Sequence, residues 1–573
     1  MFFFLKHTYQ SFRPFRVTIF SGDLPPGIEE NVLYLDAGKQ FISSYEVPLG
    51  GKLWVLGDPI GKGLDPDRVI AADGAIDLNQ LYKDLSGHYY WFWIKGKQLR
   101  LGSSFGGITP VYYNKQDDGT YICSSSVILA EQTHAPADDR RYILERLLFH
   151  YPLFNSTWYS SIKLLPAHSQ LSWNEDQVSI QRTLDFTGYA GHPSRSGKKD
   201  LRQLADQFID SCNDFMPASR FGISLTGGFD GRTLVGVGRK YRRDFFTYSF
   251  GESNSSDIMV PAQQALTLGL QYKSIILGDK YLENNASEAL AAFMSLTDFH
   301  GNIGRPHYYY SAALLGQDTP VIMTGNFGSE LFRALHLPGM MMTRQLIDVF
   351  SSRDNRWKDR LNEYVKSWAQ SKYDQELEAL IEDLDKYLNE SGLDGNPRFY
   401  RFVYEELFRK YFGPEIIMQS HFLNNRTPYL QYEFVRALNQ TVWSGVHRPL
   451  FEESKFKRMI GQFFYAQVLR NSDDKLYRLK TSKGYAPNDV GESWRKPILL
   501  YRYLIQKLNK NEVHDDNNVF VIINRFMHDS PLDVIPGTGI SFKGLDRDTL
   551  INWLSIAYGI TKLNANHYAS TTY

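Results

Sequence analysis

The sequence predicts a multidomain α/β protein, in which a β-rich first domain precedes a larger domain built on a doubly wound parallel sheet. Up to about residue 180, short aromatic and β-branched runs are separated by Gly, Asn and Asp, as in a series of β-strands. After residue 200, apolar runs alternate with amphipathic helical patterns, as in parallel sheets. Beyond about residue 340 the pattern is mostly helical. A length of 573 residues also favours more than one domain.

The expected strands of the first domain are 52–60, 89–94, 98–104, 110–114, 120–126 and 169–174. A polar, basic and glycine-containing stretch follows and is typical of a linker. We therefore predict a first domain over residues 1–187, a linker over 188–200 and a second domain over 201–573.

The second domain opens with a predicted amphipathic helix over 201–215, because its apolar residues recur at spacings of three and four. These residues are Leu201, Leu204, Phe208, Cys212 and Phe215. Buried strands are expected at 221–226, 244–250, 274–277 and 320–325. A charged run over 373–390 predicts one of the later helices.

Composition argues against several classes of function. Lys and Arg total 63, as do Asp and Glu, so there is no basic excess for general binding of nucleic acid or anionic membranes. Cys123 and Cys212 are the only cysteines and lie far apart, which argues against a disulfide framework or a zinc site. The chain has no apolar run near the ~18 residues that span a bilayer, and its start lacks the order of a signal peptide. We expect a cytoplasmic protein without a membrane partner.

The glycine turn, Thr226–Gly231, lies between an expected strand and a helical pattern. In a doubly wound sheet, ligands bind where such turns leave the carboxyl ends of the strands. Gly227 and Gly228 allow close backbone approach and successive N–H groups aimed at one point, which stabilises phosphate oxygens. Asp230 is a suitable ligand for a Mg²⁺ that bridges such a phosphate. The same residues also fit a plain strand–turn–helix connection capped by Asp230, and the chain has neither a Walker pattern nor GxGxxG.

Several motifs along the chain occur in the order found in the asparagine synthetase-like family and resemble its motifs. "LTGGFDGR" resembles the SGGxDS pyrophosphate loop of the PP-loop ATP pyrophosphatases, with Gly231 at the usual Ser position. "PVIMTGNFGSELFRA" resembles the GEGADE segment, and "NNRTPYLQYEFV" resembles the RxPFLD segment at Arg426, Pro428 and Leu430. In the first half, residues 85–113 and 157–173 are similar to stretches of the glutamine amidotransferase domain. The resemblance runs from about Leu85 to Leu430.

This resemblance implies a degenerate N-terminal Ntn-type αββα sandwich followed by a PP-loop ATP pyrophosphatase domain with a helical C-terminal part. It implies an ATP-dependent, AMP-forming ligase that adenylates a carboxylate and transfers it to an amine. The implied ATP and pyrophosphate site comprises Thr226, Gly227, Gly228, Phe229, Asp230, Gly231, Tyr248, Ser249, Phe250 and Gly325.

The resemblance also implies the metal ligands and a catalytic lysine. Asp230 and Glu330 would hold Mg²⁺ on the departing pyrophosphate. Ser329 aligns with the family's Asp when no gap is allowed, whereas one inserted residue places Glu330 there; the other interpretation is that Glu330 only caps a helix. "LYRLKTSKGYAPND" resembles the family's lysine-bearing loop, in which Lys483 is the first choice and Lys480 the alternative.

The departures from the family pattern narrow the expected reaction. Phe2 occupies the position of the nucleophilic cysteine, and Ser103 and Ser104 replace an Arg-Asp pair, so we expect no glutamine hydrolysis. Phe327 and Asn424 stand near the Tyr and Glu that deprotonate the amine in β-lactam-forming relatives. Neither side chain is a base, which disfavours a β-lactam product.

Three substrates compete within this class: an intramolecular amine, as in lasso-peptide macrocyclases; a small metabolite or sugar acid; and ammonia with aspartate, as in asparagine formation. The acid and amine partners are thus small molecules or peptides, and whether a partner protein presents the substrate stays open. A different interpretation is a non-catalytic scaffold, since several family positions are altered. A tRNA-modifying PP-loop enzyme is disfavoured by the zero net charge and the lack of CxxC pairs.

Overall fold

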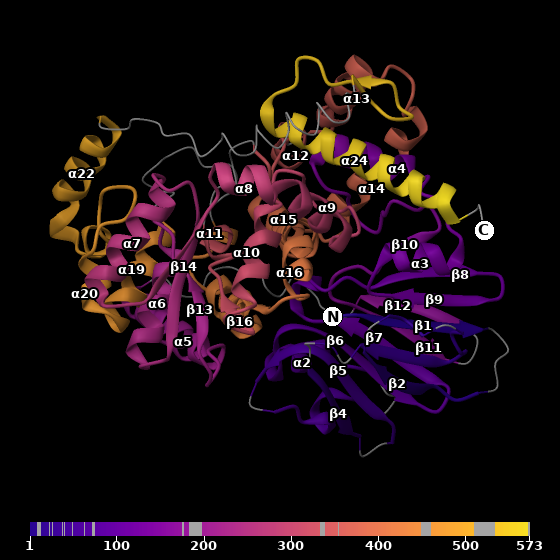
Figure 1. The fold of residues 1–573 in the computed structure, drawn as a ribbon, viewed down its shortest axis with the longest axis horizontal. Coiled ribbons are helices and arrows are strands. Elements are labelled where there is room, and N and C mark those ends of the chain that lie inside the picture. Colours follow the sequence, from indigo (N-terminus) through magenta and orange to yellow (C-terminus); the bar gives the residue numbers. More distant parts are fainter. Residues whose placement is uncertain are drawn as a thin grey trace.

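The computed structural model is a mixed α/β protein in which two antiparallel-rich sheets are joined to a five-stranded parallel sheet and a helical C-terminal part (Figure 1). The structure describes all residues except 9–12, 22, 26, 37, 39–40, 48–49, 62, 72–74, 175–176, 183–196, 333–338, 353, 448–459, 509–532 and 571–573. Among the helices within the described residues, none combines the length and apolar character needed to cross a membrane.

The first two sheets each have six strands. The first has the order β10-β8-β9-β1-β3-β2, formed by Ile162–Leu164, Tyr112–Gln116, Gly119–Cys123, Phe3–Thr8, Val32–Asp36 and Arg16–Phe20. The second has the order β12-β11-β7-β6-β5-β4, formed by Gln177–Arg182, Ser169–Asn174, Gln98–Ser103, Ser86–Lys95, Lys52–Ile60 and Phe41–Glu46. Neighbouring strands are antiparallel, except that β2 and β3 are parallel.

These two sheets stack face to face as a sandwich. The buried ring of Phe3 on β1 meets Tyr90 and Phe92 on β6, with centroids 4.8 and 4.9 Å apart. Helix α2 (Leu78–Asp84) packs on the outer face of the second sheet, where the Tyr82 hydroxyl donates to the Ser103 carbonyl at 3.2 Å. Helix α3 (Ser126–Thr133) contacts β8 and β9 of the first sheet. Two further helices are α1 (Pro66–Val69) and α4 (Arg140–Phe149).

The six predicted strands of this region are confirmed as β5, β6, β7, β8, β9 and β11, within a few residues at their ends. The sequence patterns missed β1, β2, β3, β4, β10 and β12. Residues 188–196 of the predicted linker lie outside the described residues, but 198–200 belong to α5 (Lys198–Asp214). The helix begins earlier than expected because the Asp200 carboxylate accepts the backbone N–H of Gly197 at 2.8 Å, which caps the first turn.

The third sheet is entirely parallel, with the order β15-β14-β13-β16-β17. Its strands are Tyr272–Ile276, Phe245–Gly251, Phe221–Ser224, Val321–Met323 and Asn424–Arg426. The four predicted strands are confirmed, whereas β17 was missed. The chain moves outward from β13 through β14 to β15 and then returns to β16 on the other side of β13. The carboxyl end between β13 and β16 is therefore a topological switch point.

Helices pack on both sides of this sheet, with α6 and α19 on one side and α10 and α16 on the other (Figure 1). The helices between the strands are α6 Asp230–Lys240, α7 Ser256–Leu268, α8 Asp279–Asn284, α9 Ala286–Leu296, α10 His307–Leu315 and α11 Gly328–Phe332. The later helices are α12 Arg344–Ser351, α13 Arg356–Ala369, α14 Asp374–Glu390, α15 Gly395–Phe402, α16 Gly413–Gln419, α17 Tyr432–Asn439, α19 Ile460–Ser472, α20 Asp474–Arg478, α21 Pro487–Gly491, α22 Lys496–Leu508 and α24 Arg547–Ser570.

The shorter elements are the 3₁₀ turns η1 Phe105–Gly107, η4 Pro428–Leu430, η5 Gly445–His447 and η6 Ser493–Arg495, and the small sheet of β18 Val534–Ile535 and β19 Ile540–Ser541. Residues 403–412 form a π-helix, η3 (Val403–Phe412), between α15 and α16. A π-helix of this length is unusual, and π-helical segments occur frequently at functional sites.

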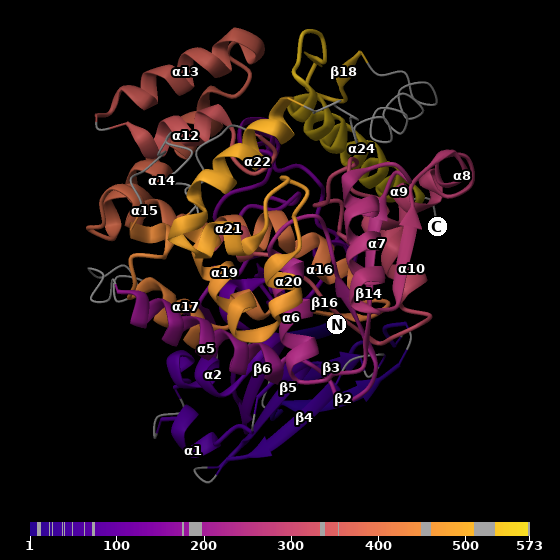
Figure 2. The ribbon, with the colours of Figure 1, turned by 90° about the vertical axis from the view of Figure 1, so that its left-hand side faces the viewer.

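The sandwich and the parallel sheet meet through specific polar contacts. Arg426 at the end of β17 binds the Asp58 carboxylate of β5 with two hydrogen bonds of 2.7 and 2.9 Å. Helix α24 (Figures 1 and 2) returns to the first half of the chain and crosses α4 (Figure 1), where the Trp553 indole donates to the Leu147 carbonyl at 3.1 Å. Hydrogen bonds at two separate places therefore connect the two halves of the chain.

Candidate functional site

The glycine turn lies at the topological switch point, between β13 and the start of α6 at Asp230. A Cβ on Gly231 would lie 2.0 Å from the Ser224 carbonyl oxygen, so only glycine allows α6 to start this close to β13. A Cβ on Gly325, which follows β16, would lie 2.5 Å from the Asp230 Cβ. The structure therefore brings the predicted residues of the β13 and β16 turns into contact.

The predicted lysine loop packs directly on the glycine turn. The Ser482 backbone N–H donates to the Gly227 carbonyl at 3.0 Å, and a Cβ on Gly227 would lie 2.5 Å from the Ser482 Cβ. Both candidate lysines, Lys480 and Lys483, have exposed side chains on this loop. Two segments separated by about 250 positions in the sequence thus form one surface, and Thr226 is exposed on it.

Arg232 was missed by the sequence analysis, although it lies next to the motif. Its side chain is fully buried, and it donates to the carbonyls of Leu479 and Lys480 at 2.6 and 2.8 Å. The Gln264 amide also donates to the Lys480 carbonyl, at 3.0 Å. Burial lowers the pKa of Arg232 to about 9. The only signal in the sequence is an arginine within an apolar helical pattern, where an unpaired charge would be costly.

Asp230 is surrounded by hydroxyl groups. The Ser329 hydroxyl donates to its carboxylate at 2.9 Å, and the Tyr429 hydroxyl donates to its backbone carbonyl at 3.1 Å. The pKa of the Tyr465 hydroxyl is raised well above its usual value, first by burial and then by Asp230, with Glu330 also contributing. Both predicted metal ligands therefore lie close to the same tyrosine, and Ser329 contacts one of them.

As metal ligands, the carboxylates of Asp230 and Glu330 fit only a site that shares the ion with a bound phosphate. Among the described residues, no group of three or more His, Cys, Asp or Glu side chains is placed to hold a metal. Mg²⁺ at phosphate-transfer sites keeps several waters and binds one or two carboxylates together with the phosphates of the substrate. Asp230 and the buried Glu330 would suffice for an ion that arrives with a phosphate, and not for a metal held by protein alone.

The predicted residues of β14 lie deeper than a ligand contact requires. The side chains of Tyr248 and Ser249 are each only 2% exposed. The Ser249 hydroxyl is 2.5 Å from the Tyr272 hydroxyl, and the Tyr248 carbonyl accepts the Leu225 N–H at 2.8 Å. Phe250 is half-buried, with its ring edge-on to Tyr308 at 5.3 Å. The side chains of Tyr248 and Ser249 therefore pack within the sheet and are not exposed to a ligand.

The rings of Phe229 and Phe327 pack against neighbouring helices and loops and so fix the positions of the turns after β13 and β16. The buried ring of Phe229 packs 5.9 Å from Tyr465 and 6.3 Å from Tyr485, which joins the glycine turn to α19 and the lysine loop. Phe327 has a φ of +70°, an outlier for an aromatic residue, and its buried ring is wedged 4.9 Å from Phe408 on η3. Such backbone strain clusters at ligand-binding sites.

The positions that depart from the family pattern in the first domain have structural contacts. Phe2 lies immediately before β1, with its ring edge-on to Phe20 at a centroid distance of 6.1 Å. The Met1 amine donates to the Ser420 hydroxyl at 3.4 Å. The buried Ser104 hydroxyl accepts the Tyr89 N–H at 3.4 Å, and Ser103 pairs with Tyr90 across the sheet.

Comparisons with known proteins leave the family unassigned. No protein-family model matches the chain, and no curated protein matches it in sequence. A weak structural similarity exists to the glutamine phosphoribosylpyrophosphate amidotransferase from B. subtilis, whose structure was determined in complex with ADP and GMP. The match has a TM-score of 0.14 and 10% sequence identity, and it covers 42% of this chain and 50% of that one. A similarity of this size carries no argument about function.

Proposed function

We propose that this protein is an ATP-dependent, AMP-forming amide-bond ligase of the asparagine synthetase-like kind. The observation that carries the proposal is the contact between the glycine turn and the lysine loop, made at the switch point of a parallel sheet. Backbone N–H groups at a helix start favour phosphate oxygens, and a cation next to them favours a reaction in which phosphate charge moves.

In the proposed first step, a carboxylate oxygen of the substrate attacks the α-phosphorus of ATP. The bond from that phosphorus to the bridging oxygen breaks, and pyrophosphate leaves. The N–H groups of the glycine turn hold the phosphates, and Lys483, or Lys480 in its place, offsets the negative charge of the transition state. Asp230 and Glu330 would hold Mg²⁺, which supplies a counter-charge to the pyrophosphate.

In the second step, an amine attacks the carbonyl carbon of the acyl-adenylate, the C–O bond to AMP breaks, and the amine loses a proton. Phe327 and Asn424 lack a basic group, so the proton goes to another acceptor, such as the departing phosphate or water. Arg232 keeps the lysine loop in place during both steps through its bonds to the carbonyls of Leu479 and Lys480. It is a positioning residue.

We further propose that the sandwich is an Ntn-type αββα unit that has lost glutamine hydrolysis, and that residues 201–573 form the PP-loop ligase unit. The two stacked sheets of the sandwich, with α2 and α3 on their outer faces, support the Ntn-type assignment. Without glutamine hydrolysis, the nitrogen would come from an amine substrate or from free ammonia. Macrocyclisation of a peptide, amidation of a metabolite and asparagine formation remain the candidate reactions.

The test is thermal unfolding of the full chain with and without Mg²⁺ and ATP, followed by release of pyrophosphate with candidate acids. ATP at a hundred times its dissociation constant should stabilise the protein by about 2.7 kcal/mol. Asp230→Ala should abolish this stabilisation. Asp279→Ala is the matched control, because Asp279 is an exposed acid in the first turn of α8 and lies on no predicted site. No response of the wild type to ATP would refute the ligase proposal and favour the non-catalytic scaffold.

A further inference from the structure

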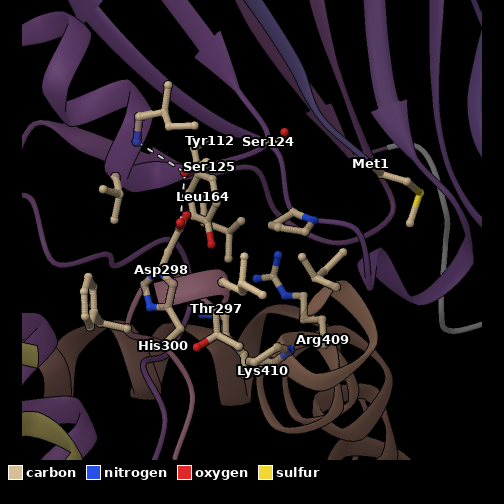
Figure 3. A pocket seen from close by; sticks show the side chains of 18 of the residues that line it. Met1, Tyr112, Ser124, Ser125, Leu164, Thr297, Asp298, His300, Arg409 and Lys410 are labelled. Atoms are coloured by element: carbon tan, nitrogen blue, oxygen red, sulfur yellow. Dashed lines mark hydrogen bonds between the residues drawn. The ribbon is translucent and has the colours of Figure 1, made fainter. Parts of the chain in front are cut away.

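A cavity of about 360 Å³ lies between the sandwich and helices that connect the strands of the parallel sheet (Figure 3). Its walls come from the β8–β9 region and α3 on one side, and from η3, α16 and the residues after α9 on the other. None of the described residues that line it belongs to the glycine turn or the lysine loop. The cavity is therefore a separate place at which a ligand could bind.

Most of the wall is apolar. Apolar side chains from five separate segments contribute to it, namely Ile108, Ile128, Leu164, Leu296 and Ile417. Small-molecule sites of this size are typically lined by apolar side chains with a few polar groups that orient the ligand. An apolar body of modest size would suit this wall.

Arg409 on η3 lines the cavity, with its guanidinium directed into it (Figure 3). Its terminal nitrogens donate to the carbonyls of Leu165 and Phe154 at 2.7 and 2.9 Å, and to Glu406 at 2.8 Å. Its Nε has no hydrogen-bond partner among the described residues and is itself closed to solvent, because the side chain is only 3% exposed. A buried charged donor without an acceptor is costly, so a ligand oxygen that reached Nε through a small movement of the side chain would be stabilising.

The cations Arg409 and Lys410 favour an anion at this end, whereas the acids Glu131 and Asp298 also line the cavity. Lys410 donates to the carbonyls of Pro152 and Phe154, and both cations pair with the Glu406 carboxylate. Glu145 also stabilises the charged form of Lys410. Asp298 lies on the opposite side of the cavity (Figure 3). Its carboxylate accepts the Ser125 hydroxyl at 2.8 Å and the Ser126 N–H at 2.6 Å, so it is already hydrogen-bonded.

His300 and Tyr112 are two further polar groups in the lining. The buried imidazole of His300 lies 2.7 Å from the Tyr142 hydroxyl and 3.3 Å from the Ser126 hydroxyl, and burial lowers its pKa far below the ordinary value, so it is neutral. The Tyr112 hydroxyl lines the cavity, and burial raises its pKa well above 10, so it is also neutral and able to donate a hydrogen bond.

We propose that this cavity binds a small monocarboxylic acid with an apolar body, its carboxylate against the Arg409 guanidinium and its body against the apolar wall. The π-helical form of η3 is a second observation in favour of the proposal, because π-helical segments occur frequently at functional sites. The inference does not depend on the ligase proposal, and it requires neither ATP nor a reaction.

The experiment is titration calorimetry of the full chain with hexanoate, hexanol and hexylamine as probes. Hexanoate should bind with one site per chain. The alcohol and the amine should bind at least about tenfold more weakly, since a hydrogen bond to a charged group contributes that much in affinity. No binding of hexanoate at millimolar concentration, or equal binding of all three probes, would overturn the proposal.

Variants locate the site. Ile128→Phe adds bulk to the cavity wall and should abolish hexanoate binding, whereas Ile19→Phe makes the same change at a position that is 50% exposed on β2 and should leave binding unchanged. Arg409→Gln removes the charge and should weaken binding about tenfold or more. Because Arg409 also joins the two halves of the chain, its variant could fail to fold, and Ile128→Phe then decides. Unchanged binding in Ile128→Phe would place hexanoate elsewhere and overturn the proposal.

Discussion

Gly227→Ala gives the sharpest test of the contact between the glycine turn and the lysine loop. The new Cβ would lie 2.5 Å from the Ser482 Cβ and 2.7 Å from its hydroxyl oxygen. The loop must retreat by about 0.9 Å before the 2.5 Å approach reaches the 3.4 Å at which ordinary contact begins. Overpacking of this kind costs about 1–3 kcal/mol, and strain on the Ser482–Gly227 hydrogen bond adds about 0.5–1.5 kcal/mol.

Two further variants separate this clash from other effects of alanine. A Cβ on Gly228 would meet nothing closer than the Thr226 hydroxyl oxygen at 3.5 Å, so Gly228→Ala should be neutral or stabilise by up to about 1 kcal/mol. Ser482→Gly removes both clashing atoms and leaves the Ser482 Cα at 3.6 Å. Adding it to Gly227→Ala should therefore restore most of the lost stability.

The assay is chemical denaturation of all four proteins, together with the stabilisation by Mg²⁺ and ATP. Gly227→Ala should lower the free energy of unfolding by about 1.5–4.5 kcal/mol and weaken the response to ATP, because the lysines move with the loop. If Gly227→Ala and Gly228→Ala behave alike, or if Ser482→Gly gives no rescue, the proposed contact is wrong.

Three other predictions follow from buried polar groups. Arg232→Met should destabilise by about 1–3 kcal/mol, because the Leu479 carbonyl loses its side-chain donor whereas the Lys480 carbonyl keeps the Gln264 amide. It should lower the rate of pyrophosphate release more than the affinity for ATP; equal effects on both would contradict a positioning role. Arg426→Met should cost about 3–5 kcal/mol in denaturant unfolding, because it leaves the Asp58 carboxylate buried and unpaired, and a loss below about 1 kcal/mol, as at an exposed pair, would contradict it. Burial lowers the pKa of His88 to about 4, so the unfolded state takes up its proton first, and stability should fall as the pH drops from 6.5 toward 4. His88→Gln should reduce the loss of unfolding free energy between pH 6.5 and pH 4 by up to about 3 kcal/mol. An unchanged dependence of stability on pH would contradict this prediction.

The sequence predicted the parts of the fold whose pattern is local. The four apolar strands of the parallel sheet and the helix over 201–215 were recognisable because burial requires apolar residues at fixed spacings. Strand β17 was missed because "NNR" carries no apolar signal; its position depends on pairing with β16 and on the Arg426–Asp58 contact. Strand β4 was missed for a related reason: it lies at a sheet edge, where three of its six residues are exposed and none is fully buried.

The sequence predicted the individual segments of the candidate site but not how they are arranged in space. The glycine turn, Glu330 and the lysine loop were each identified from sequence, and the structure brings the turn and the loop into contact. The role of Arg232 was not predictable, because it follows from the position of two carbonyls about 250 residues away. The burial of Tyr248 and Ser249 was equally hidden, since alternation along a strand does not tell how far a strand end projects from its sheet.

The π-helix η3 connects the two places at which we propose ligands. Phe408 and Phe412 pack against Phe327 in the turn after β16, and the next positions on the same helix, Arg409 and Lys410, bind the sandwich and line the cavity. A shift of η3 would therefore act on the strained φ of Phe327 and on the cavity wall together. Contact alone does not establish coupling, because coupling requires that both ligands bias the same two-state element. If hexanoate changes the affinity for ATP by a given factor, ATP must change the affinity for hexanoate by that same factor. Equal affinities with and without the second ligand would show that η3 is a rigid wall between independent sites.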